Sequence, residues 1–115
     1  MSGTVGVLYR AGGVKATNAD LYVRTLGFRP TKLKVTNLTN QVEVEWHAGL
    51  AEGKNLKRIA AGDLSVLASG GVTPVDADSN GNPGFVIPAA LADVNDTTTE
   101  DLVWEAWGGA PALNP

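Results

Sequence analysis

The sequence predicts an all-β fold, either a β-sandwich or a small antiparallel barrel, built from about seven or eight short strands. Its 115 residues include 14 glycines and 6 prolines, a combined share above the roughly 12% that is ordinary. Charged residues make up only 18% of the chain, below a typical value of about 25%. Apolar and polar residues alternate with period two in several short segments, which is typical of half-buried strands. Many turn formers and few charges favour short strands over long helices.

We expect three parts in the chain: a flexible N-terminal arm over residues 1–20, a β-sandwich domain over residues 21–108 and a C-terminal tail over residues 109–115. Glycine and alanine dominate the first part, which has little apolar surface to bury by itself. Two interpretations of it stay open: a frayed terminus, or an arm that adds a strand to the sheet of a neighbouring molecule. Its candidate partner-binding residues are Val5, Val7, Leu8, Tyr9 and Arg10.

The first strand of the expected domain is residues 21–28, which are apolar enough to be buried. The clearest alternation follows, because apolar side chains occupy every second position of residues 32–36 and again of residues 42–47. Each segment therefore has one apolar and one polar face, and the short Asn- and Thr-rich connection predicts an antiparallel hairpin. The polar face of this hairpin carries charges expected to pair across the strands, from Lys32, Lys34, Glu43 and Glu45.

The chain after the hairpin is less regular. Residues 50–61 are ambiguous, because their apolar spacing fits a helical turn while the surrounding glycines leave no room for a long helix. Residues 63–68 predict a short strand, and residues 69–84 predict a loop because they hold the densest turn chemistry in the chain. The elements expected next are a short strand over residues 85–87 and a single helical turn over residues 88–94.

The last expected strand, residues 101–107, is apolar on both sides at one end. Leu102 and Trp104 share one face, whereas Trp107 falls on the other face with Val103. Together with the sparse charge, this pattern indicates a surface that is buried against other copies of the chain or against a partner. The alternative is a strand covered on both faces by the domain's own loops. Trp107 is therefore a further candidate partner-binding residue.

Composition excludes several classes of function. The absence of cysteine excludes disulfides, zinc–thiolate sites and cysteine nucleophiles, and a single histidine, His47, excludes a multi-histidine metal centre within one chain. The net charge of −3 argues against nucleic-acid binding. No apolar run approaches the ~18–20 residues of a membrane span, and the first residues lack the layout of a secretion signal. We expect neither an enzyme nor a cofactor, and no nucleic-acid or membrane partner.

Two motifs have a ligand-binding interpretation. Residues 76–81 match the opening of a calcium-binding loop, but Ile87 stands at the twelfth position where that motif needs a bidentate glutamate, so a polar turn is favoured. The three tryptophans, Trp46, Trp104 and Trp107, offer a platform for a sugar ring, although tryptophans on strands more often belong to a core or an interface. A carbohydrate-binding module is therefore one alternative function.

A series of short motifs runs from the first expected strand to the last. They are residues 27–30 (GFRP), 33–39 (LKVTNLT), 45–50 (EWHAGL), 70–74 (GGVTP), 84–87 (GFVI), Asn95 and 102–106 (LVWEA). In this order they resemble a pattern of small structural proteins of tailed bacteriophages, in which a GF-x-P turn leads into V-x-N-x-T and x-E-W-x-x-G strands. The pattern ends with a GF-x-I-G turn, an asparagine and L-x-W-x-A, and Pro88 departs from it by standing where the pattern has glycine.

The resemblance implies a virion structural protein of the head decoration, or cement, type. Such a protein is an all-β module on the outer surface of the capsid, bound to the major capsid protein and often to copies of itself as a homotrimer. It also implies that no cofactor or catalytic residue is needed. A phage protein associated with the tail or a fibre is the alternative within the virion.

Overall fold

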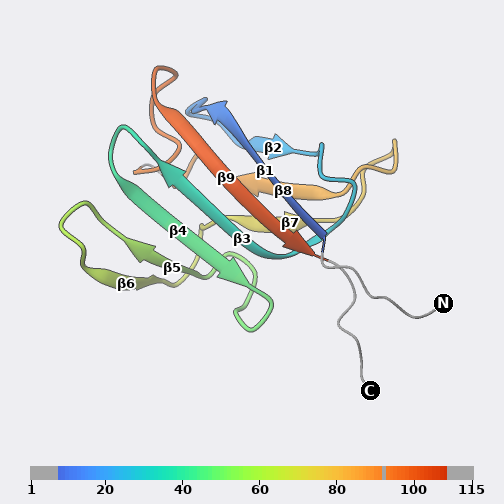
Figure 1. The fold of residues 1–115 in the computed structure, drawn as a ribbon, viewed down its shortest axis with the longest axis horizontal. Coiled ribbons are helices and arrows are strands. Elements are labelled where there is room, and N and C mark those ends of the chain that lie inside the picture. Colours follow the sequence, from blue (N-terminus) through green and yellow to red (C-terminus); the bar gives the residue numbers. More distant parts are fainter. Residues whose placement is uncertain (1–7, 92, 109–115) are drawn as a thin grey trace.

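The chain is all-β in the computed structural model, which describes residues 8–91 and 93–108 (Figure 1). This confirms the predicted fold class. Within the described residues, nine strands form two antiparallel sheets, one strand more than the upper end of our expectation. The strands are β1 (Leu8–Lys15), β2 (Leu21–Val23), β3 (Pro30–Asn37), β4 (Val42–His47), β5 (Asn55–Arg58), β6 (Leu64–Leu67), β7 (Thr73–Val75), β8 (Gly84–Ile87) and β9 (Asp101–Gly108).

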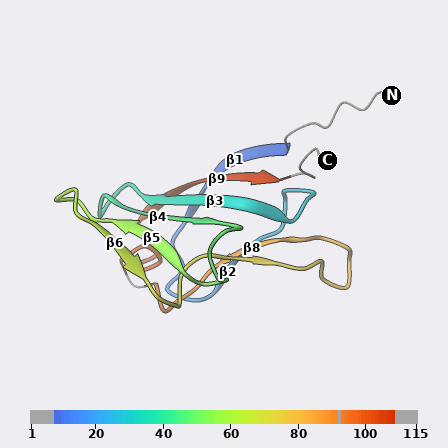
Figure 2. The ribbon, with the colours of Figure 1, turned by 90° about the horizontal axis from the view of Figure 1, so that it is seen from below.

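The two sheets lie one above the other as the layers of a sandwich (Figure 2). The larger sheet has six strands in the order β1-β9-β3-β4-β5-β6, and the smaller has the order β2-β8-β7. All paired strands run antiparallel. No helix in the described part of the chain has the length and apolar character needed to cross a membrane.

The predicted hairpin is present as β3 and β4. Val35 lies opposite Val44 on the buried face, and the N–H of Gln41 donates to the carbonyl of Asn37 at 2.8 Å to close the turn. The expected charge pairing runs diagonally. Glu45 is the residue directly across from Lys34 in the register, but the Nζ of Lys34 lies 3.1 Å from Oε2 of Glu43. At an exposed site such a pair contributes only about 0.2–1 kcal/mol.

The core lies between the sheets and draws on alternate residues of every long strand except β1. Leu33, Val35, Val44 and Ala106 from the larger sheet have no exposed surface, and neither has Phe85 from the smaller one. The ring of Phe85 meets that of Trp104 edge to face, with centroids 5.5 Å apart. An aromatic pair of this geometry adds about 0.5–1.5 kcal/mol beyond the area it buries.

Three fully buried asparagines connect the loops to the sheets. Asn95 accepts a hydrogen bond from the N–H of Thr17 at 2.8 Å and donates one to the carbonyl of Ile87 at 2.9 Å. Asn37 donates to the carbonyl of Val94 at 2.8 Å. Asn55 accepts a hydrogen bond from the N–H of Val72 and donates one to its carbonyl. Each amide satisfies buried backbone groups that would otherwise lack a partner.

The expected N-terminal arm is wrong for residues 8–20. Residues 8–15 form β1, which pairs along its whole length with β9, so the folded domain starts well before residue 21. The glycines that indicated a flexible segment have a packing role instead, because a Cβ on Gly12 would lie 2.7 Å from Cζ2 of Trp104. Val5 and Val7, like the tail expected over residues 109–115, lie outside the described residues.

Several expected boundaries also differ. The ambiguous residues 50–61 contain β5, and the expected loop 69–84 contains the short strand β7. The strand expected over residues 21–28 ends at Val23. Residues 88–91 and 93–94 contain turns and no assigned helix, with the N–H of Leu91 bonded to the carbonyl of Pro88 at 3.1 Å. The N–H of Asn95 bonds to the carbonyl of Leu91 at 2.8 Å, which is the spacing of a single helical turn.

Candidate interaction surface

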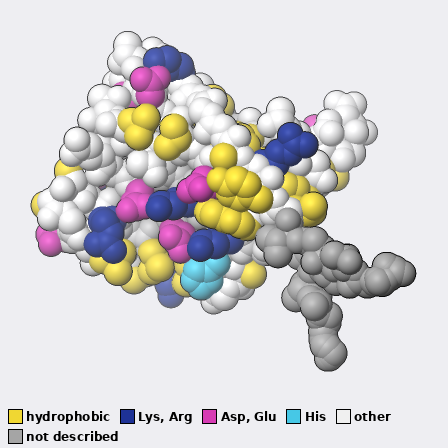
Figure 3. Space-filling model, viewed as in Figure 1, with side chains coloured by type: hydrophobic (Ala, Val, Ile, Leu, Met, Phe, Trp, Pro, Cys, Tyr) yellow, Lys and Arg dark blue, Asp and Glu magenta, His cyan; other side chains and the backbone are white. Residues whose placement is uncertain are grey.

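The solvent-facing side of the six-stranded sheet is the candidate functional surface, and we call it the outer face (Figure 3). Because side chains alternate along each strand, the odd-numbered residues of β4 and β9 point to this side, and so do the even-numbered residues of β3 from Lys32 onward. Charged side chains occupy its centre over β3 and β4, and apolar side chains lie toward both edges. The face carries Tyr9, Lys32, Lys34, Glu43, Glu45, His47, Leu56, Arg58, Leu64, Val66, Val103, Glu105 and Trp107.

An aromatic pair, Tyr9 and Trp107, marks the β1–β9 edge of this face. The two residues lie directly opposite each other in the strand register, and their ring centroids are 5.4 Å apart at an angle of 51°. Tyr9 keeps 49% of its surface exposed. Large aromatic side chains that stay exposed in a folded chain are typical anchors of protein interfaces.

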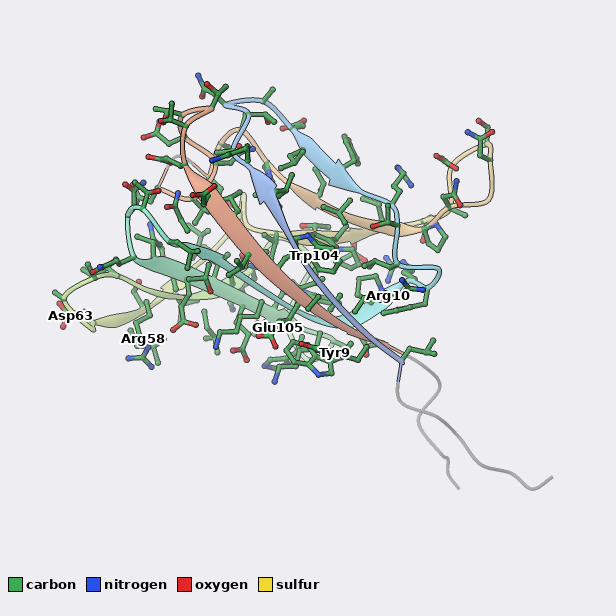
Figure 4. All side chains as sticks on the ribbon, turned by 45° about the horizontal axis from the view of Figure 1, so that its top comes forward. Tyr9, Arg10, Arg58, Asp63, Trp104 and Glu105 are labelled. Atoms are coloured by element: carbon green, nitrogen blue, oxygen red, sulfur yellow. The ribbon has the colours of Figure 1, made fainter. Side chains whose placement is uncertain are left out.

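Two charged residues hold the aromatic pair in place. The Oη of Tyr9 donates a hydrogen bond to Oε2 of Glu105 at 2.8 Å, and the labelled side chains lie close together in Figure 4. The Nζ of Lys32 lies 4.8 Å from the ring centroid of Trp107, within the range of a cation–π contact. The hydrogen bond between Tyr9 and Glu105 raises the pKa of Tyr9 above its ordinary value, with smaller contributions from burial and from the charge of Glu105.

At the centre of the outer face, the charged side chains form ion pairs with one another. Glu43 lies between two cations, 3.1 Å from Nζ of Lys34 and 3.8 Å from Nε of Arg58. Its hydrogen bond and charge raise the pKa of Lys34. Because these charges are paired within the chain, a partner would gain little by contacting them. The apolar edges are therefore the parts of this face best suited to binding.

The predicted site residues separate into two groups. The structure brings Tyr9 and Trp107 together, but Leu8 and Arg10 point to the opposite side of β1 because neighbouring residues of a strand alternate. Sequence reasoning missed Lys32 and Glu105 as the residues that frame the aromatic pair. A clue was present, since both lie on the same alternating face as Trp107, but only the strand order β1-β9-β3 makes them neighbours.

The tryptophan platform, the less favoured interpretation of the three indoles, does not form. Trp46 and Trp104 are 4% and 7% exposed and belong to the core, so only Trp107 reaches the outer face. The indole N–H of Trp46 donates to the carbonyl of Ala51 at 3.2 Å. The alternation that placed all three tryptophans on strands therefore separates them onto two sides of one sheet.

The calcium-like loop between β7 and β8 is filled by an arginine. Nη1 of Arg24 donates to the carbonyls of Asp76 and Asn82 at 3.1 and 2.7 Å. The carboxylate of Asp78 accepts the backbone N–H groups of Asn80 and Asn82. The bond from Asn82, followed by that from Asn80 and the charge of Arg24, lowers the pKa of Asp78. These contacts make the polar turn that the sequence favoured, and no group of three acidic or histidine ligands suited to a metal occurs among the described residues.

Comparisons of the chain with protein-family models, with curated protein sequences and with solved structures found no match.

Proposed function

We propose that this chain is a structural module of a phage virion that binds the outside of the head shell and stabilises it. Two observations support the proposal. The motifs spread over residues 27–106 resemble small structural proteins of tailed bacteriophages, and the outer face carries at one edge an aromatic pair, the exposed Tyr9 and the half-buried Trp107. The partner would be the major capsid protein, and the chain would act without catalysis or cofactor.

The aromatic pair is the single feature that carries the docking part of this proposal. Tyr9 and Trp107 are fixed before binding, by Glu105 on one side and Lys32 on the other. Anchors that are already ordered lose little conformational entropy when a partner covers them. Aromatic residues of this kind contribute about 2 kcal/mol or more each when they sit at the centre of an interface.

The physical advantage of such a module is that it binds only the assembled shell. A ligand that binds one state alone stabilises that state. A rigid module that bridges neighbouring capsid subunits would do so at every equivalent junction of the shell. The homotrimer that the resemblance implies would add avidity, because each further contact becomes intramolecular once the first has formed.

A carbohydrate-binding module is less well supported. Lys32 lies over the ring of Trp107 and Tyr9 packs beside it, so the indole is already in contact with two side chains. A sugar ring would have to displace at least one of them. Tryptophan fluorescence that changes on titration with a glycan would support this alternative over docking to a protein.

Copy number in purified virions tests the location. Quantitative mass spectrometry of the phage that encodes this chain should give a ratio to the major capsid protein on the order of one to one, or one trimer per local three-fold position, as in shells with saturating decoration. A few copies per particle would place the protein in the tail or fibres. Its absence would overturn the virion proposal.

A binding assay with matched variants tests the surface. Purified heads that lack the protein are titrated with the wild-type chain, with Trp107→Ala and with Tyr22→Ala. Tyr22 lies on β2 in the other sheet and is 52% exposed, close to the 49% of Tyr9. We expect Trp107→Ala to weaken binding by at least about tenfold. Equal binding by all three chains would show that the aromatic pair is not the docking site.

A further inference from the structure

The edge of the larger sheet farthest from the aromatic pair is an open apolar strand. β6 is the last strand in the sheet order, and nothing in the described part of the chain pairs with its free side. Leu64 and Val66 on its outer face are 57% and 59% exposed. Soluble proteins usually protect such edges with charges, proline or a bulge. The sequence of β6, LSVL, contains none of these.

The hydrogen-bonding pattern shows which backbone groups are free. The N–H of Ile59 donates to the carbonyl of Asp63 at 3.3 Å, immediately beyond the paired residues of β5 and β6. Hydrogen-bonded and non-hydrogen-bonded pairs alternate along an antiparallel ladder. Counting from that bond, Ser65 directs its N–H and C=O toward β5, whereas Leu64 and Val66 direct theirs to the open edge.

We propose that β6 pairs antiparallel with β6 of a second copy of this chain, with Ser65 on the two-fold axis. A continuous sheet requires opposite residues to point to the same side, so Leu64 meets Val66 of the second copy and Ser65 meets itself. In this register the free N–H and C=O groups of Leu64 and Val66 form the hydrogen-bonded pairs. With Val66 on the axis instead, Leu64 would have no partner within β6, so the Ser65 register pairs more of the free backbone groups.

Charge and side-chain chemistry agree with this pairing. Of the charges nearest to β6, Arg58 and Asp63 lie at the same end of the strand (Figure 4). Lys57, which lies opposite Ser65, is paired with Asp93 of its own chain at 2.6 Å. The two-fold axis places that end against the other end of the second copy, where β6 and β5 present Leu67 and Asn55, so no like charges meet. On the outer face, Leu56, Leu64 and Val66 of each copy form one continuous aliphatic band.

The small size of the contact sets its strength. β6 has four residues, and a pairing of this length buries less than the about 1,200–2,000 Å² of stable complexes. The dimer is therefore weak, and the fraction of chains in it rises with protein concentration. It leaves the β1–β9 edges at its two ends, so each dimer presents two aromatic pairs and binds a multivalent surface with avidity.

Sedimentation velocity over a concentration series tests the dimer. The wild-type chain should pass from monomer to dimer, and Val66→Lys should raise the dissociation constant at least about tenfold, because it places a charge on each copy's edge. The matched control is Val103→Lys, a valine 40% exposed on the same face of β9, which should leave the dissociation constant unchanged. Circular dichroism should report the same fold and thermal midpoint for all three chains.

Cross-linking tests the register independently of affinity. The chain has no cysteine, so Ser65→Cys introduces a single thiol. At a non-hydrogen-bonded pair on the axis, the two Cα atoms lie about 4.5 Å apart, within the range of a disulfide. We expect rapid oxidation to a covalent dimer for Ser65→Cys and slow oxidation for Leu64→Cys, whose copies are offset along the strands. A chain that stays monomeric at millimolar concentration, a trimer insensitive to Val66→Lys, or equal cross-linking of the two thiols would overturn the proposal.

Discussion

Gly12 of β1 lies against the indole of Trp104, so closely that a Cβ at position 12 would be 2.7 Å from Cζ2 of the ring. The two residues face each other directly in the β1–β9 register. Trp104 in turn packs on Phe85 of the other sheet. A glycine in the outermost strand is therefore required by an aromatic contact at the centre of the sandwich.

Gly12→Ala should destabilise the fold by about 1–3 kcal/mol, because the added methyl group overpacks the indole and pushes β1 away from β9. The neighbouring Gly13→Ala is the matched control, since a Cβ there would meet only the carbonyl of Leu102 at an ordinary 3.5 Å. Denaturant unfolding measures the two free energies of unfolding, and hydrogen exchange of β1 locates the change. If both variants lose equal stability, the packing explanation fails.

The fold was more predictable than this contact, and the reason lies in how far apart the contacting residues are in the sequence. Residues 32–47 form a hairpin of nearest neighbours, and their alternation predicts both faces. Gly12 and Trp104 meet only because β9 lies between β1 and β3, which no local pattern encodes. Without that pairing, a Gly- and Ala-rich segment has the composition of a flexible arm.

In the candidate surface, too, local alternation predicts some features, whereas others depend on the strand order. The placement of the half-buried Trp107 on the outer face followed from its position on the more polar side of an alternating strand. Its partner Tyr9 was identified from the apolar character of the first residues, but was expected on an arm together with Leu8 and Arg10. The buried amides of Asn37, Asn55 and Asn95 gave no signal, because asparagine in a sequence more often indicates an exposed turn.

The Tyr9–Glu105 hydrogen bond predicts a pH dependence. Tyr9 donates only while it is protonated, and the hydrogen bond raises its pKa above the ordinary value of 10.0. A group whose pKa is raised in the folded state stabilises that state below the unfolded pKa, and the contribution is lost as pH rises through the folded pKa. The packing of β1 should therefore be constant below about pH 10 and weaken above it.

Comparison with Tyr9→Phe isolates this contribution. The variant keeps the ring stacked on Trp107 but has no hydroxyl to titrate, so its stability should lack the component that falls above pH 10. Thermal unfolding at a series of pH values, with sodium chloride fixed, gives both curves. Parallel curves for the two chains across that range would show that Tyr9 does not titrate in contact with Glu105.

Asn55 predicts a large loss of stability from the removal of one amide. Its Oδ1 accepts the N–H of Val72 at 2.8 Å and its Nδ2 donates to the carbonyl of Val72 at 3.2 Å, with both residues fully buried. Asn55→Ala leaves two buried backbone groups unpaired and should cost about 2–4 kcal/mol. The exposed Asn80→Ala should change the free energy of unfolding by less than about 0.5 kcal/mol. Urea unfolding of the two variants checks the prediction, and a small loss for Asn55→Ala would mean that water replaces the amide.

The order of the β7–β8 loop should depend on the guanidinium of Arg24, the cation that its carbonyls bind. The guanidinium supplies the positive charge and the donors that hold the carbonyls of Asp76 and Asn82 together. Arg24→Met keeps much of the apolar stem but removes both donors, so hydrogen exchange of residues 76–83 should become faster while that of β8 stays protected. The wild-type chain should show no heat of binding on titration with millimolar Ca²⁺, since Arg24 bonds two carbonyls of the loop and the carboxylates of Asp76 and Asp78 already accept bonds from Arg29 and from backbone N–H groups. Arg24→Lys is the control that keeps the charge and should retain part of the protection. Calcium binding by the wild-type chain, or unchanged exchange in Arg24→Met, would contradict the assignment of Arg24 as the cation that organises this loop.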